Sequence, residues 1–184
     1  MDSDLQLLNN VTLKGFGFYL SSDPEIKGEF RDLEVQADKI QYNNVEYKSE
    51  LGYWLGQGMM GYTGIQAKIA QFAVLFLDVG KDQTKKDSDL LNSSLMLGFI
   101  TSSENDRTSQ VKAGQLFERV WLTATASDIR LQPMSQVLEV PQTKKEMAKI
   151  VPVNGSYLQQ TFRLGYAPLE TEYTPRRPLK DVLV

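Results

Sequence analysis

Residues 109–127 form the most regular amphipathic segment of this sequence, and they constrain its fold more than any other feature. Apolar side chains recur there at intervals of three and four residues, with charged and amide side chains between them. This spacing predicts one long helix, placed centrally and buried along a single apolar face. The face consists of Ala113, Leu116, Phe117, Val120, Trp121 and Ala124.

The rest of the sequence contains both helical and extended patterns. Further helices are expected at residues 22–43, 46–55 and 142–150. Apolar or alternating segments typical of strands occupy residues 11–20, 72–79, 95–100 and 157–167. Residues 130–136 are expected to be extended, and the charged residues 81–89 to form a solvated connection. Since these elements lack a regular βαβ alternation, the sequence predicts an α+β fold.

The length and net charge of the sequence exclude several classes of protein. The 184 residues suffice for one domain with a full hydrophobic core. A net charge of −3 argues against nucleic acid as the main partner, because neutralising phosphates requires an excess of cations. The sequence has no run of 18 apolar residues, and its acidic N-terminus lacks the features of a signal peptide. We therefore expect a cytoplasmic protein with neither a nucleic-acid nor a membrane partner.

The sequence contains neither Cys nor His. This excludes disulfides, thiolate nucleophiles, the usual zinc sites and every catalytic triad that uses an imidazole. Acid–base catalysis near neutral pH would require an Asp, Glu or Lys with a strongly shifted pKa. A binding protein, or an enzyme whose chemistry comes from a cofactor, is therefore favoured, and we nominate no metal ligand and no catalytic side chain.

Gly56, Gly58 and Gly61 match the dinucleotide-binding pattern GxGxxG. That motif needs a strand before it and the start of a helix after it, so that backbone N–H groups can reach a pyrophosphate. A helical pattern precedes the glycines here. We therefore interpret the segment as a loop rather than as a nucleotide site.

Arg176 and Arg177 lie between two prolines near the C-terminus. Two adjacent guanidinium groups can bind a phosphate through paired hydrogen bonds. A solvated basic tail is the alternative, and the dipeptide alone does not decide between them.

Four segments resemble, in order, motifs of the nitroreductase-like flavoproteins. They are AGQLFERVWLTATA at 113–126, LQPMSQVLEVP at 131–141, FRLGYAP at 162–168 and PRRPLKDVLV at 175–184. The closest resemblance is to the divergent Acg-type branch, in which such a helix, turn, strand and tail follow one another. Residues 47–55 also resemble the helix before the glycine-containing loop of that branch, so the match extends over residues 46–184.

The resemblance implies an α+β fold with a mixed or antiparallel sheet flanked by helices, and FMN bound at the interface of a homodimer. In the family, the turn after the long helix lies against the isoalloxazine ring and offers backbone N–H groups near its reactive nitrogen. In this sequence the turn consists of Pro133, Met134, Ser135 and Gln136. The family's C-terminal basic residues, here Arg176 and Arg177, bind the FMN phosphate.

The activity implied is transfer of a hydride from NAD(P)H through FMN to a small oxidised acceptor. The alternative is a non-catalytic protein of the same fold that sequesters FMN or acts as a dimeric scaffold. The family's Arg-x-Ser-x-Arg-like segment has no match in residues 1–60. We therefore expect a single domain, residues 1–184, without the usual N-terminal flavin-contacting helix. Residues 168–184 are expected to form an extended arm that is exchanged within the dimer.

Overall fold

The computed structural model describes residues 2–77, 79–151, 156–168, 179–181 and 183. Two compact units are present, unit 1 (Met1–Gln41 and Gly80–Ala167) and unit 2 (Tyr42–Val79 and Pro168–Val184). The strands are β1 (Phe16–Ser21), β2 (Met96–Ser102), β3 (Arg130–Pro133) and β4 (Tyr157–Gly165). The α-helices are α1 (Asp2–Asn9), α2 (Pro24–Tyr42), α3 (Val45–Gly56), α4 (Gly64–Phe76), α5 (Gly80–Ser93), α6 (Arg107–Ala126), α7 (Gln136–Glu139) and α8 (Pro141–Ile150). The 3₁₀ helices are η1 (Met59–Gly61) and η2 (Leu179–Asp181).

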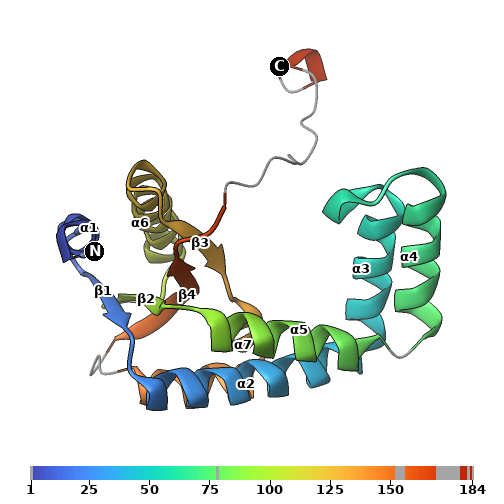
Figure 1. Ribbon diagram of the computed structural model, residues 1–184, viewed down its shortest axis with the longest axis horizontal. Helices are drawn as coiled ribbons and strands as arrows, with labels where there is room; N and C mark the ends of the chain where they lie inside the picture. Colours follow the sequence, from blue (N-terminus) through green and yellow to red (C-terminus); the bar gives the residue numbers. More distant parts are fainter. Residues whose placement is uncertain (1, 78, 152–155, 169–178, 182, 184) are drawn as a thin grey trace. The chain divides into compact units, whose positions relative to one another are not determined.

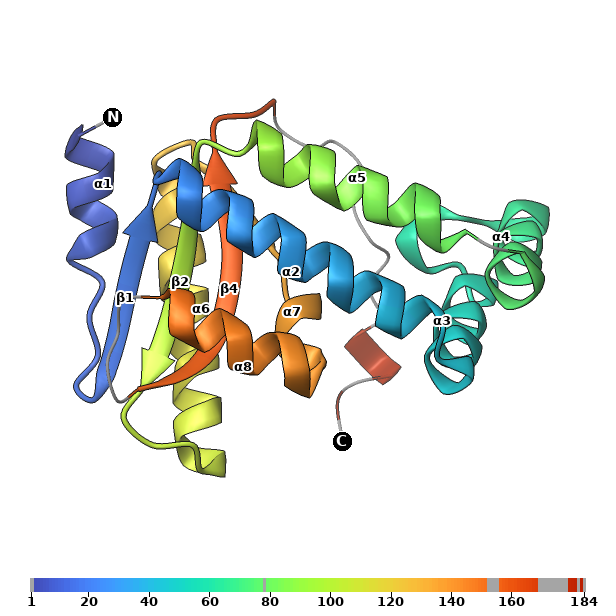
Figure 2. The same cartoon turned by 90° about the horizontal axis from the view of Figure 1, so that it is seen from below.

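Unit 1 is built on a four-stranded sheet with the order β1-β2-β4-β3. All three pairings between described strands are antiparallel. Helices cover both faces, with α1 and α6 on one face and α2, α5, α7 and α8 on the other (Figures 1 and 2). This arrangement confirms the expected α+β class.

Each face of the sheet has its own hydrophobic core. The core under α6 includes Leu8, Ile100, Ala113, Leu116, Val120, Ala124, Leu131, Phe162 and Leu164. The core on the opposite face includes Phe30, Leu91, Leu97, Phe99, Met134, Val137, Met147 and Leu158. Because successive side chains of a strand point to opposite faces, β2 and β4 both contribute to both cores.

Gly98 permits the close packing of β2 on β4. A Cβ atom built on Gly98 would lie 2.2 Å from Cε2 of Phe162, which is fully buried. Phe162 also lies against the ring of Phe117 on α6, with ring centroids 5.3 Å apart. The missing side chain at Gly98 therefore makes room for the aromatic ring that joins the sheet to α6.

Unit 2 contains a hairpin of two helices, in which α3 packs against α4. Asn44 caps α3, since its Oδ1 accepts hydrogen bonds from the backbone N–H groups of Glu46 (2.8 Å) and Tyr47 (3.1 Å). Gly56 ends α3, and Gly58 follows it with φ of 91°, a conformation that favours glycine. The glycine-rich segment is thus a turn that follows a helix, as predicted.

Most predicted elements are present with shifted ends, but two predictions are wrong. Residues 72–79, expected to be a buried strand, lie mainly in α4, and Phe72 and Phe76 are exposed. Residues 81–89, expected to be a solvated connection, belong to α5. The strand expected at 11–20 is shorter, since β1 begins only at Phe16. Within the described residues, no helix is long and apolar enough to cross a membrane.

Candidate functional site

The turn predicted to contact a cofactor joins the sheet to α7. Pro133 ends β3 and is exposed, while Ser135 and Gln136 are half-buried. Met134 differs from its neighbours, because its side chain is 1% exposed and belongs to the core on the α2 side of the sheet. The side chain of Met134 is therefore a core residue, and a ligand at this turn would contact the flanking positions.

Hydrogen bonds to β4 fix the first half of this turn. The Met134 N–H donates to the carbonyl oxygen of Thr161 at 3.0 Å, and the Thr161 hydroxyl donates to the Met134 carbonyl. Pro133 has no backbone N–H. Two of the four residues therefore have no N–H group to offer a ligand.

The second half of the turn keeps its donors. The backbone N–H groups of Ser135 and Gln136 have no acceptor among the described residues. The Ser135 hydroxyl is anchored by a hydrogen bond from Gln160 Nε2 at 3.2 Å. Two adjacent N–H groups on a half-buried turn fit an electron-rich ring that accepts hydrogen bonds.

Arg176 and Arg177, the predicted phosphate ligands, lie outside the described residues. The structure therefore does not relate them to the turn, and their role stays a prediction from the sequence. The same holds for the extended arm expected at residues 168–184, of which only 168, 179–181 and 183 are described.

Side chains of α2 form hydrogen bonds with both ends of α7, the short helix that follows the turn. Glu34 Oε2 accepts a hydrogen bond from the Val137 N–H at 2.9 Å. Gln41 Nε2 donates to Glu139 Oε2 at 2.6 Å. The Thr143 hydroxyl, on α8, donates to the Val137 carbonyl at 2.8 Å. The four residues of α7 are thus fixed by side chains from two neighbouring helices.

Three carboxyl groups are buried between α2 and α5, next to this attachment. Glu34, Asp38 and Asp87 are 0%, 1% and 4% exposed. Burial first, and then the negative charges of Asp38, Asp87 and Glu139, raise the pKa of Glu34 from 4.5 to about 8, against the lowering effect of the Val137 hydrogen bond. Burial, and then Asp87 through its charge and a hydrogen bond, raises the pKa of Asp38 from 3.8 to about 7. Glu34 therefore keeps its proton at neutral pH, and the pKa of Asp38 lies close to neutrality.

Arg163, on β4, is a cation that interacts with Asp87 of this cluster. Its guanidinium donates to the Leu90 carbonyl at 3.0 Å, in the last turn of α5, and to Gln132 Oε1 at 2.6 Å. Burial lowers the pKa of Arg163, and the charge of Asp87 partly offsets this. Among the described residues, no group of acidic side chains is placed to hold a metal ion.

The sequence analysis missed these buried acids, although the sequence contains a signal for them. Glu34, Asp38 and Gln41 follow Phe30 at intervals of three and four, so they continue the apolar face of their helix. Polar side chains on the core face of a helix are rarely buried without a partner. Such positions are candidates for a buried polar cluster even when no motif marks them.

No protein-family profile matches this chain. Two curated relatives from Mycobacterium tuberculosis, named "Putative NAD(P)H nitroreductase Rv3131" and "Putative NAD(P)H nitroreductase MT3217", are each 34% identical to it over 162 residues. The alignment covers 82% of this chain and 46% of each relative. The chain therefore spans about half the length of the curated relatives that it matches.

Solved structures share the fold at low sequence identity. The FMN-dependent nitroreductase NfnB from Mycobacterium smegmatis, solved with NADPH, matches with a TM-score of 0.61 and 14% identity over 100% of this chain and 86% of its own. Iodotyrosine deiodinase, solved with FMN and 3-iodo-L-tyrosine, gives a TM-score of 0.61 and 15% identity over 96% of this chain and 82% of its own. A nitroreductase from Desulfitobacterium hafniense, solved with FMN, matches with a TM-score of 0.56 and 12% identity over 100% of this chain and 86% of its own.

Proposed function

We propose that this chain, which has the fold of solved nitroreductases, is a member of the nitroreductase-like family and an oxidoreductase that binds FMN and transfers a hydride from NAD(P)H to a small oxidised acceptor. The similarity over 82% of the chain to the relative named "Putative NAD(P)H nitroreductase Rv3131" carries this proposal. The finer assignment to the Acg-type branch rests on the sequence motifs alone, and a cytoplasmic location stays an expectation from the sequence.

The residues of this chain would bind and orient the flavin. The Ser135 and Gln136 N–H groups would donate to the ring, since both lack an acceptor among the described residues. The exposed ring of Pro133 would contact the flavin edge, and Arg176 and Arg177 would bind its phosphate. The flavin, when bound, supplies the redox chemistry, which suits a chain without Cys or His.

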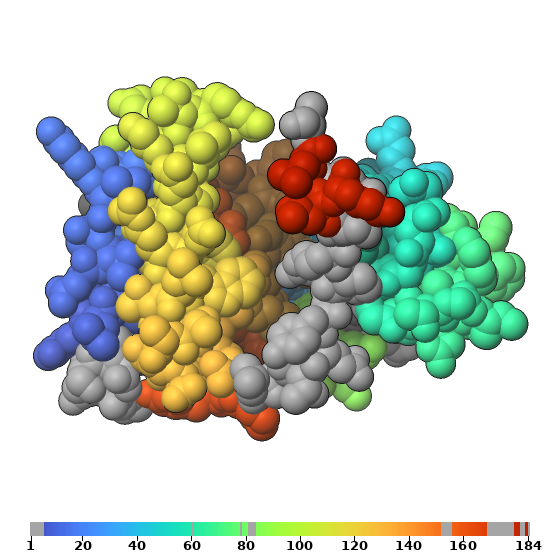
Figure 3. All heavy atoms as spheres, turned by 90° about the horizontal axis from the view of Figure 1, so that it is seen from above, coloured from blue at the N-terminus to red at the C-terminus, as the bar shows by residue number. Residues whose placement is uncertain are grey.

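We propose in addition that the protein is a homodimer. Helix α4 of unit 2 has a stripe of apolar side chains in which Ile65, Ile69, Phe72 and Phe76 are 56–79% exposed. On unit 1, the outer side of α6 lies at the surface (Figure 3) and exposes Val111 and Leu122. Exposed apolar patches of this kind are typical of interaction sites.

The experiment is to add FMN to the purified protein, remove free flavin by gel filtration and record the visible spectrum. We expect retained flavin absorbance, and then oxidation of NADH or NADPH when a nitro compound or a quinone is supplied. Bound flavin without turnover would indicate a store rather than an enzyme. A colourless protein would contradict both flavin functions.

The twin arginines provide a matched test of the phosphate contact. The double variant Arg176→Gln and Arg177→Gln should weaken FMN binding at least tenfold, since each charge-assisted hydrogen bond contributes about 1.5–3 kcal/mol. Lys180→Gln removes a nearby exposed charge and should leave the affinity almost unchanged. Equal effects from both variants, measured by quenching of flavin fluorescence, would indicate a general electrostatic contribution and no specific phosphate contact.

A further inference from the structure

Glu34 links the buried carboxyl cluster to the turn that we assign to the flavin. Its Oε2 atom accepts the Val137 N–H at 2.9 Å, and Val137 directly follows Gln136. Its other oxygen, Oε1, is buried and has no hydrogen-bond partner among the described residues. Glu34 is therefore the contact through which α2 holds the start of α7.

The surroundings of Glu34 are unfavourable to a negative charge. Asp38 on its own helix, Asp87 on α5 and Glu139 on α7 all face it with charge of the same sign. Arg163 on β4 faces Asp87 instead. Because the Glu34 side chain is 0% exposed and lies near three other acidic groups, its neutral form is favoured over its charged form.

Val137 depends on Glu34 for its hydrogen bond. The Val137 side chain is fully buried in the core, and the residue lies at the second position of α7, where no carbonyl of the same helix is available to its N–H. Without an acceptor from α2, this N–H would be unpaired in a buried position. Loss of this hydrogen bond would allow the first turn of α7 to move. The N–H groups of Ser135 and Gln136 would then lose their fixed orientation.

We propose that Glu34 is a positioning residue for the flavin, which sets the orientation of the Ser135 and Gln136 N–H groups by holding Val137 in place. The inference rests on the proposed FMN binding, because the turn is assigned to the flavin there. Ionisation of Glu34 would strengthen the hydrogen bond from the Val137 N–H, while it adds one more negative charge next to Asp38, Asp87 and Glu139. The positioning role therefore rests on the hydrogen bond itself, which both the neutral and the charged carboxyl group can accept.

Two variants separate the hydrogen bond from the charge. Glu34→Gln keeps an acceptor oxygen for the Val137 N–H and is neutral at every pH, whereas Glu34→Met has a similar length and no acceptor of comparable strength. In Glu34→Gln, FMN affinity at pH 7 should stay close to that of the wild type. In Glu34→Met it should be about tenfold weaker, as expected for one lost buried hydrogen bond.

Amide hydrogen exchange of Val137 provides a readout that needs no flavin. At pH 7 the Val137 N–H should be protected in the wild type and in Glu34→Gln, and should exchange about tenfold faster in Glu34→Met. Unchanged protection in Glu34→Met would overturn the proposed contact. Loss of protection with unchanged FMN affinity would overturn the positioning role. If the wild type binds no FMN, the proposed function fails while the exchange result still decides whether Glu34 holds α7.

Discussion

At the scale of single residues, the sheet leaves no room for a side chain at Gly98, which faces Phe162 on β4. A Cβ at position 98 would lie 2.2 Å from the Phe162 ring, so Gly98→Ala must displace a fully buried aromatic side chain. We expect the free energy of unfolding to fall by about 1–3 kcal/mol, the usual cost of overpacking a core. Urea unfolding followed by circular dichroism measures this change.

Gly28→Ala is the matched control for Gly98→Ala. Gly28 lies within α2, and nothing lies within 4 Å of a Cβ built there. Alanine in a helix is favoured over glycine by about 0.5–1 kcal/mol, so this variant should be slightly more stable than the wild type. Equal destabilisation by both variants would show that the Phe162 contact is not the cause.

The buried acids predict an unusual dependence of stability on pH. Between pH 4.5 and about 8, Glu34 binds a proton in the folded protein and has released it in the unfolded chain. The free energy of unfolding should therefore fall with rising pH in this window, by up to about 1.4 kcal/mol per pH unit for one proton. Asp38 acts in the same direction between pH 3.8 and about 7.

Glu34→Gln tests this dependence because glutamine binds no proton. The variant should show a shallower decline of stability between pH 5 and 8, measured as midpoints of urea unfolding at several pH values. A decline as steep as that of the wild type would mean that Glu34 titrates normally in the folded protein.

At the scale of elements, the cap of α3 is a clear test of local sequence signals. Asn44 Oδ1 pairs with two N–H groups in the first turn of the helix, and Asn44→Ala would leave both to water. The opening free energy of α3 should fall by about 1 kcal/mol, which corresponds to about fivefold faster amide exchange in its first turn. Asn44→Asp retains a capping oxygen and should exchange like the wild type.

Helices with strong local signals could be predicted from the sequence, and those that depend on their surroundings could not. Residues 109–127 show a regular apolar face, and α6 lies there, at Arg107–Ala126. The run from Phe72 to Leu77 fits a buried strand equally well by composition, but it continues a helix that begins at Gly64. A short apolar run does not distinguish a strand from part of a helix, because its composition fits both. In α5, the many charged side chains obscure the helical pattern in the sequence, although Leu91 of this helix packs in the core.

The candidate site stays a prediction, and its local geometry could not be foreseen from the sequence for a similar reason. Motif resemblance nominated the residues from Pro133 to Gln136, but it gave no information on which of their N–H groups remain available. That depends on Thr161, a residue 27 positions away that pairs with Met134. Contacts of such sequence separation are decided by the sheet register, which no local pattern specifies.

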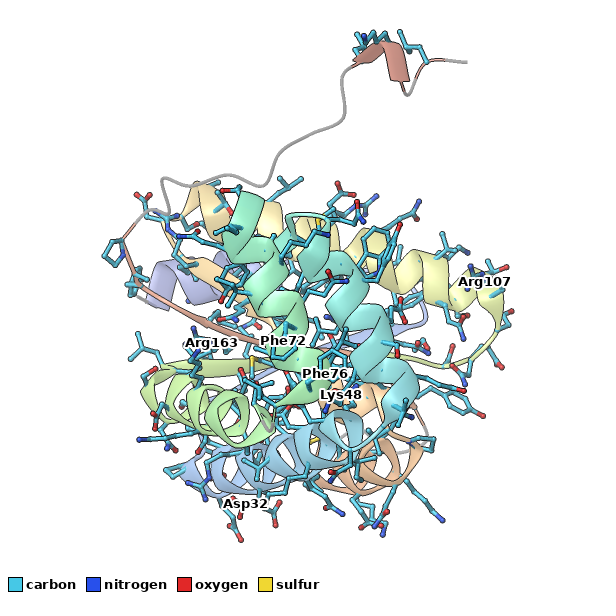
Figure 4. All side chains as sticks on the ribbon, turned by 90° about the vertical axis from the view of Figure 1, so that its right-hand side faces the viewer. Asp32, Lys48, Phe72, Phe76, Arg107 and Arg163 are labelled. Carbon is cyan, nitrogen blue, oxygen red and sulfur yellow. The ribbon has the colours of Figure 1, made fainter. Side chains whose placement is uncertain are left out.

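At the scale of the whole molecule, self-association through the apolar stripe of α4 is the property to test. Phe72 and Phe76 lie on one face of α4 (Figure 4), with ring centroids 4.9 Å apart. Phe72→Glu would place a charge in this stripe, and we expect light scattering at micromolar concentration to show a shift from dimer to monomer. Because Phe72 is 56% exposed, the folded chain should tolerate the change.

Gln66→Glu adds the same charge to another exposed position of α4 and should leave the dimer intact. A wild type that is monomeric under these conditions would contradict the dimer. Dissociation by both variants would assign the effect to net charge rather than to the apolar stripe.

The participation of β2 and β4 in both cores of unit 1 has a consequence for how this unit denatures. Leu97 and Phe99 project into one core and Ile100 into the other, so the two layers share the same backbone. Neither layer can melt while its counterpart keeps native packing. Heating should therefore disrupt both sides of the sheet in a single cooperative transition, without a stable half-folded species.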